Sequence, residues 1–167
     1  YSQLAAAVQA MSPLIAEVPA DHDVVLDFYT SHSGASDDAE GKQQQIHRTL
    51  NEACFPRAIR RIVVALVGRG SREGINRMLQ FTYRPSAEGY KEEKFYRGLH
   101  PMMGKRLQLW RLSNFNIQRL PSVEDVYLLH AVARDNPKDE RLFACAEVRD
   151  VTPVRNEAGR IVGLPHL

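Results

Sequence analysis

The sequence predicts an α+β domain with a mainly antiparallel sheet of about five to six strands. Several segments alternate apolar and polar residues or form short apolar runs, as β-strands do. Some of these segments follow one another across short turns, so the strands they form must be antiparallel. Two further segments carry one apolar stripe at helical spacing. We expect these two long helices to cover one face of the sheet, with a further helical segment at the N-terminus.

The N-terminal helical segment is the stretch "QLAAAVQAM". Leu4, Val8 and Met11 recur at helical spacing, and the alanines between them favour a helix. Pro13 and Pro19 interrupt or flank this region.

The first strand and the first long helix follow. "DHDVVLDFYT" is rich in β-branched and aromatic residues, which favour a strand. After a loop rich in Ser, Gly and Asp, "KQQQIHRTLNEACF" places Ile46, Leu50, Ala53 and Cys54 on one face of an otherwise polar helix. Pro56 ends that helix.

Four more strands are expected. "IRRIVVALVG" is apolar on both faces, as in a central strand, and "INRMLQFTYRP" points Leu79, Phe81 and Tyr83 to one side. "DVYLLHAVARD" and "ERLFACAEVRDV" are joined by "NPKD", a strong turn signal. The stretch "RPSAEGYKEEK" is read as a loop.

The second long helix is predicted from His100–Pro101, because proline is tolerated at the first helical position. Met103, Leu107 and Trp110 then form an apolar stripe. The prediction is a core helix, with Trp110 buried against the sheet rather than lining a site for chemistry.

The glycines of "VALVGRGSREG" resemble a phosphate-binding loop only superficially. Gly68, Gly70 and Gly74 have the spacing GxGxxxG, and they lead into a second strand rather than into a helix. We therefore predict a hairpin turn.

The titratable residues suggest no catalytic, cofactor or metal site, and we predict none. The histidines lack HxH, HxxxH and HExxH spacing; they are His22, His32, His47, His100, His130 and His166. We expect His47 on the polar side of its helix and His130 partly buried and hydrogen-bonded. Ser31–Ser33, "SHS", is read as a loop, since a triad is assembled from separate segments. Asp37, Asp38 and Glu40 are expected to cap the following helix.

Charge and cysteine content exclude several classes of protein. The 22 basic and 20 acidic residues give a net charge of +2, which provides no case for nucleic acid or an anionic membrane as partner. Cys54 and Cys145 form no CxxC pattern and are expected to pack as small apolar side chains. A cytoplasmic location fits, because no signal peptide or membrane-spanning run is visible.

The densest basic cluster lacks the interleaved aromatic residues of a nucleic-acid surface. We expect it to form solvated strand ends, or contacts with another domain. Its members are Arg57, Arg60, Arg61, Arg69, Arg72 and Arg77.

The segment "YKEEKFYRGLHPMMGKRLQLWRLSNFNIQRLP", with the "DVYLLHAVARDNPKDERLFACAEVRD" that follows, closely resembles the central region of multidomain, eukaryotic-type acetyl-CoA carboxylases. The resemblance covers residues 59–151 well and the N-terminal third weakly. His100 stands where that family usually has an acidic residue, so a role of that side chain does not transfer. The low Lys and high Arg content suits a bacterial homologue. The positions that carry the resemblance are Arg97, Pro101, 111–117, 126–127, 139–143 and Arg149.

The resemblance implies a non-catalytic scaffold or spacer within a biotin-dependent ligase. It would position biotin carboxylase and the biotin carrier relative to the carboxyltransferase for malonyl-CoA synthesis. Those domains would be its partners in a homo-oligomeric parent enzyme, and biotin, ATP and a divalent metal would bind there and not here. The biotin-attachment motif A/V-M-K-M is absent, since "PMMGK" has the wrong order. A regulatory or acyl-CoA-binding module is the alternative.

The expected domain organisation follows from these readings. Residues 1–20 form the N-terminal helical segment, 21–152 the α+β central-region subdomain and 153–167 a linker toward the following segment. The chain opens on Tyr1 and stops at Leu167, which we read as a piece of a longer polypeptide.

Overall fold

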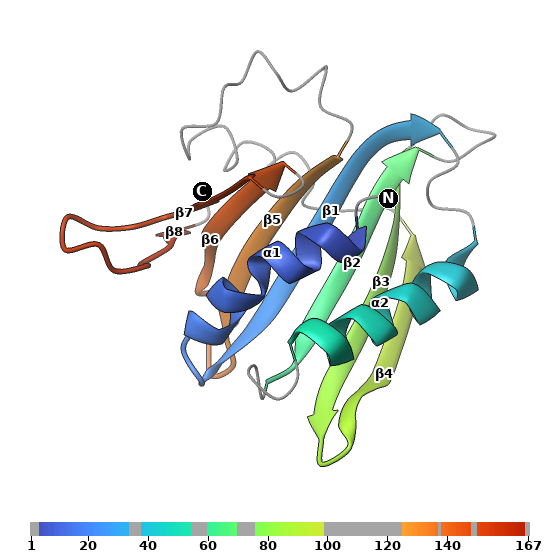
Figure 1. Ribbon diagram of the computed structural model, residues 1–167, viewed down its shortest axis with the longest axis horizontal. Coiled ribbons are helices and arrows are strands. Elements are labelled where there is room, and N and C mark those ends of the chain that lie inside the picture. The colour runs from blue at the N-terminus through green and yellow to red at the C-terminus, as the bar shows by residue number, and fades with distance from the viewer. Residues whose placement is uncertain are drawn as a thin grey trace.

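The computed structural model describes residues 4–33, 38–54, 60–69, 76–98, 125–136, 138–147 and 150–165. Within these ranges both helices lie over one face of a single mixed sheet (Figure 1). The α+β class is therefore confirmed. The helices are α1 (Leu4–Glu17) and α2 (Ala39–Ala53), and the strands are β1 (His22–Ser33), β2 (Ile62–Arg69), β3 (Asn76–Ser86), β4 (Gly89–Gly98), β5 (Asp125–Ala133), β6 (Glu140–Glu147), β7 (Asp150–Pro153) and β8 (Leu164–Pro165).

The sheet is larger than the sequence suggested and contains one parallel pair. Its eight strands run β4-β3-β2-β1-β5-β6-β7, with β8 pairing β6. β1 and β2 are parallel, with Val24 opposite Ile62, and the other pairs are antiparallel. The parallel pair follows from connectivity, since parallel neighbours need a long crossover and α2 provides it.

The strand β4 was not predicted, and it occupies much of the stretch read as a loop. A two-residue turn after Ser86 brings Gly89 opposite it, and β4 pairs with β3 from there. β4 is an edge strand that exposes Lys91, Glu92 and Glu93. Such charges protect an edge from further pairing, and they also hide the apolar alternation that signals a strand.

The main core lies between the sheet and the two helices. The predicted alternation in β3 is confirmed, because Leu79, Phe81 and Tyr83 are all buried on the helix-covered face. Phe28 and Tyr127 meet edge to face in the same core, with ring centroids 4.8 Å apart. Each large side chain buried here contributes roughly 1.5–3 kcal/mol of transfer free energy.

α1 continues through Pro13 and ends at Glu17. Proline removes one helical hydrogen bond, and the helix tolerates it because buried residues on both sides hold it against the core. α1 packs on α2 and on the strands β5, β6 and β7. Its buried residues are Leu4, Ala7, Val8, Met11, Ser12 and Ile15.

α2 starts at the acidic cap that the sequence predicted. Asp38 has a left-handed backbone, with φ 52°, and its Oδ1 accepts a hydrogen bond of 3.1 Å from the Gly41 amide. Ile46, Thr49 and Leu50 are buried, and Cys54 closes the C-terminal end. The predicted apolar stripe therefore faces the sheet.

The C-terminal strands cover the β6 edge of the sheet. β7 pairs with one part of β6 and β8 with another, and residues 154–162 fold into a turn at Gly159. Arg141 of β6 donates to the carbonyls of Val162 and Gly163, both at 3.1 Å. Residues 150–165 are thus hydrogen-bonded to the sheet.

Two predictions concern residues 70–75 and 99–124, which the structure does not describe. The predicted hairpin is confirmed by its flanks, since β2 and β3 are antiparallel neighbours. The helix expected from Pro101, with Trp110, lies outside the described residues. Neither α1 nor α2 has the length and hydropathy to cross a membrane.

Candidate functional site

The three histidines whose side chains are described lie in three different environments. His22 Nδ1 lies 2.7 Å from Asp21 Oδ1 at the start of β1. This contact is the main reason that the pKa of Asp21 is lowered. His47 and His130 each contact a different part of the sheet, and the contacts of the three described histidines do not involve one another. The described residues therefore contain no histidine cluster.

His47 and Asn51 of α2 hold the main chain of β4. His47 Nε2 donates to the Tyr90 carbonyl, and the Tyr90 amide donates to Asn51 Oδ1 at 2.6 Å. The His47 ring also stacks on Tyr83, with centroids 5.7 Å apart. His47 was expected on the polar side of the helix, but it is half-buried against the sheet because β4 supplies a backbone acceptor there.

Asp27 and His130 meet inside the protein. Asp27 Oδ2 and His130 Nε2 are 3.2 Å apart, and both side chains are fully buried. His130, predicted to be partly buried and hydrogen-bonded, is fully buried and lies against Asp27. The two residues lie on the sheet face opposite the main core, together with buried Leu128 and Cys145. Because both side chains are fully buried, the pair is a polar contact between β1 and β5 inside the protein.

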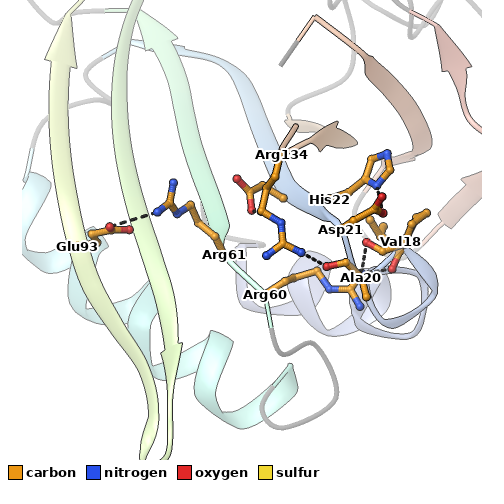
Figure 2. A network of polar contacts seen from close by, with 10 residues as sticks. Val18, Ala20, Asp21, His22, Arg60, Arg61, Glu93 and Arg134 are labelled. Atoms are coloured by element: carbon orange, nitrogen blue, oxygen red, sulfur yellow. Dashed lines mark hydrogen bonds and ion pairs between the residues drawn. The ribbon is translucent and has the colours of Figure 1, made fainter. Parts of the chain in front are cut away.

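A second polar cluster joins the turn between α1 and β1 to the ends of two strands (Figure 2). Arg60 Nη1 donates to the carbonyl of Val18, and Arg134 Nη2 donates to that of Ala20. These carbonyls follow the C-terminal end of α1, where the helix dipole favours a cation. The two guanidinium groups therefore fix the α1–β1 turn to the sheet.

The neighbouring arginines 60 and 61 have different surroundings. Arg61 points the other way and pairs with Glu93 of β4 at 3.3 Å, on the exposed surface (Figure 2). Arg60 is buried, which departs from the solvated strand end that the sequence predicted. Its burial lowers the pKa of its guanidinium, and the charge of Arg134 lowers it further. The side chains of Arg57, Arg69, Arg72 and Arg77 lie outside the described residues.

Buried hydroxyl and thiol groups remain in their neutral forms. Burial raises the pKa of Cys54 to about 12 and also raises the pKa values of Tyr83 and Tyr90. A nucleophilic cysteine needs a lowered pKa, and Cys54 has the opposite. Cys54 and Cys145 are both buried thiols, so their prediction as small, packed side chains is confirmed.

A surface cavity of about 360 Å³ lies between α2 and the strands β3 and β4. Carboxylates from two elements line it, and it was not anticipated because one of them comes from the unpredicted strand β4. Across the described ranges, no group of three or more His, Cys, Asp or Glu side chains is placed to hold a metal ion. The residues around the cavity are Ala39, Glu40, Gln43, Phe81 and Glu92.

Comparison with known proteins identifies the kind of chain. A sequence model of the family described as "Acetyl-CoA carboxylase, central region" matches residues 15–158. From residue 15 on, the match includes the N-terminal third, which the sequence motifs alone related to the family only weakly. Over 77 residues the chain is 35% identical to acetyl-CoA carboxylase from Schizosaccharomyces pombe. The matched stretch is 41% of this chain and spans 3% of the length of that protein.

Proposed function

Since this chain belongs to the acetyl-CoA carboxylase central-region family, we propose that it is a non-catalytic scaffold within a biotin-dependent acyl-CoA carboxylase. It would position biotin carboxylase and the biotin carrier relative to the carboxyltransferase during malonyl-CoA synthesis. These domains would be its partners within one cytoplasmic polypeptide. The parent enzyme would be a homo-oligomer of that polypeptide. Biotin, ATP and a divalent metal would act in those domains.

The proposal is supported by the partners of the polar side chains. Four of them form hydrogen bonds with main-chain groups of another element or turn: Arg60, Arg134, His47 and Asn51. Asp27 is occupied by His130. Such contacts fix the geometry of a framework, whereas a catalytic site needs groups that face a substrate.

A regulatory or acyl-CoA-binding module is less well supported. The cavity beside α2 is lined by Glu40 and Glu92, which would repel the phosphates of a CoA thioester. Arg60 and Arg61 are already bonded, one to carbonyls and one to Glu93. The charge distribution of the described residues therefore favours the scaffold.

The proposal can be tested in the full-length parent enzyme with Arg60→Met, which removes the Arg60 hydrogen bonds to the α1–β1 turn. A scaffold predicts that ATP-dependent carboxylation of free biotin and decarboxylation of malonyl-CoA persist, while coupled malonyl-CoA synthesis falls. Arg61→Met, which removes only a surface pair, is the matched control and should leave all three rates unchanged.

Two results would contradict the scaffold. One is a parallel loss of a half-reaction and the coupled reaction in Arg60→Met. The other is turnover of either half-reaction by the isolated 167-residue chain.

A further inference from the structure

The cavity beside α2 combines an apolar floor with a charged rim. Phe81 forms part of the floor and is 1% exposed, whereas Glu40 and Glu92 are exposed on opposite elements. Glu40 belongs to the first turn of α2 and Glu92 to the edge strand β4. Glu92 lies opposite Tyr83 in the β3–β4 pair, and its charge adds to burial in raising the pKa of Tyr83.

Two described cations close to Glu92 have acidic partners of their own. Lys91 pairs with Glu88 at 3.5 Å, and Arg61 pairs with Glu93 at 3.3 Å. Among the residues that the structure describes, neither Glu40 nor Glu92 has an ion-pair partner. As far as the described residues show, the cavity therefore presents two carboxylates that form no ion pair, around a space large enough for a long side chain.

We propose that this cavity, lined by Glu40 and Glu92 over Phe81, receives an arginine side chain from a neighbouring domain of the parent polypeptide. The inference rests on the proposed scaffold function and names the chemistry of one docking contact. The methylene stem of an arginine would lie against the apolar floor. Its planar guanidinium carries five N–H donors and can bond to two carboxylates at once, which a lysine ammonium does less well.

The test is a titration of the 167-residue chain with N-acetyl-arginine amide, followed through its amide NMR signals. We expect saturable shifts at Gln43, Phe81 and Glu92, with a roughly millimolar Kd. N-acetyl-citrulline amide, the neutral isostere, should give no saturable shifts. N-acetyl-lysine amide should bind more weakly than the arginine probe.

Variants separate the cavity from general surface charge. Glu92→Gln and Glu40→Gln should each weaken binding about threefold to fivefold, and the double variant should abolish saturation. Glu93→Gln, the next residue along β4, should bind the arginine probe like the unaltered chain.

Equal binding of citrulline, equal binding of lysine, or unchanged binding in the double variant would each overturn the proposal. Absence of saturable shifts with the arginine probe would do so as well. None of these results would touch the scaffold function, which depends on the carboxylase half-reactions.

Discussion

Asp27 on β1 and His130 on β5 form a buried contact of 3.2 Å between Oδ2 and Nε2. They are diagonal neighbours, because Val25 lies opposite His130 and Asp27 opposite Leu128 in the antiparallel pair. Both side chains are fully buried. Removing one residue therefore leaves the other ionisable side chain in the interior without the Asp27–His130 contact.

We expect Asp27→Ala to lower the free energy of unfolding by about 3 kcal/mol. His130→Ala should have a similar cost, and the double variant should cost less than the sum, with a coupling of about 1–3 kcal/mol. Urea denaturation followed by circular dichroism measures all three. The control is Asp135→Ala, an exposed aspartate just after the same strand β5, which should change stability by less than about 0.5 kcal/mol. Additive costs for the two single variants would show that the contact contributes nothing.

Arg60 and Arg61 provide a second comparison, between a buried and an exposed arginine at adjacent positions. Arg60→Met keeps the length of the side chain but removes its donors to the Val18 and Pro19 carbonyls. We expect a loss of about 1.5–3 kcal/mol, as for hydrogen bonds to a charged group.

Arg61→Met removes a surface pair with Glu93 and should cost no more than about 1 kcal/mol. Thermal unfolding of both variants measures the difference. Equal melting temperatures would contradict the role assigned to Arg60 in fixing the α1–β1 turn.

The sequence was informative where a side chain's environment depends on local pattern. The alternation of Leu79, Phe81 and Tyr83 and the cap at Asp38 are both local, and both were predicted correctly. The parallel pairing of β1 and β2 was missed because it depends on how a helical connection folds back. The strand β4 was missed because its exposed charges, which suit an edge strand, mask its periodicity.

The polar contacts could be predicted only in part. Burial of His130 followed from its register in an apolar strand, but its partner Asp27 comes from a distant segment. His47 and Arg60 bond to backbone carbonyls. Every residue has such a carbonyl, so the sequence does not indicate which one a side chain will bind. The cavity rim joins α2 to β4, so it could not be assembled without the missed strand.

Cys54 makes stability depend on pH in the alkaline range. Its pKa rises from 9.0 to about 12 on folding because the thiol is buried. Between these values the unfolded chain has lost the thiol proton while the folded chain retains it, so the free energy of unfolding falls as pH rises. The contribution is complete below pH 9.0 and is lost as the pH rises toward about 12.

Cys54→Ala should therefore unfold with a shallower pH dependence above pH 9.0 than the unaltered chain. Burial also raises the pKa values of Tyr83 and Tyr90, so some alkaline destabilisation should remain in the variant. Urea denaturation at a series of pH values measures both slopes. The slopes should coincide near neutral pH, which serves as the internal control, and identical slopes in the alkaline range would refute the assignment.

Gly89 starts β4 at the point where α2 holds the strand, and its backbone φ of +130° is strained for any other residue. A Cβ there would lie 2.5 Å from Asn51 Oδ1, the atom that accepts the Tyr90 amide. Gly89→Ala should therefore both strain the turn and displace Asn51, at a cost of roughly 2–4 kcal/mol.

Gly159 offers the matched control, because its φ is also positive, +79°, but a Cβ there meets nothing within 4 Å. Gly159→Ala should show the backbone cost alone, about 1 kcal/mol. Hydrogen exchange of the Tyr90 amide distinguishes the two mechanisms, since its protection should fall in Gly89→Ala and in Asn51→Ala but not in Gly159→Ala. Retained protection of Tyr90 in Gly89→Ala would mean that Asn51 does not hold the β4 edge to α2.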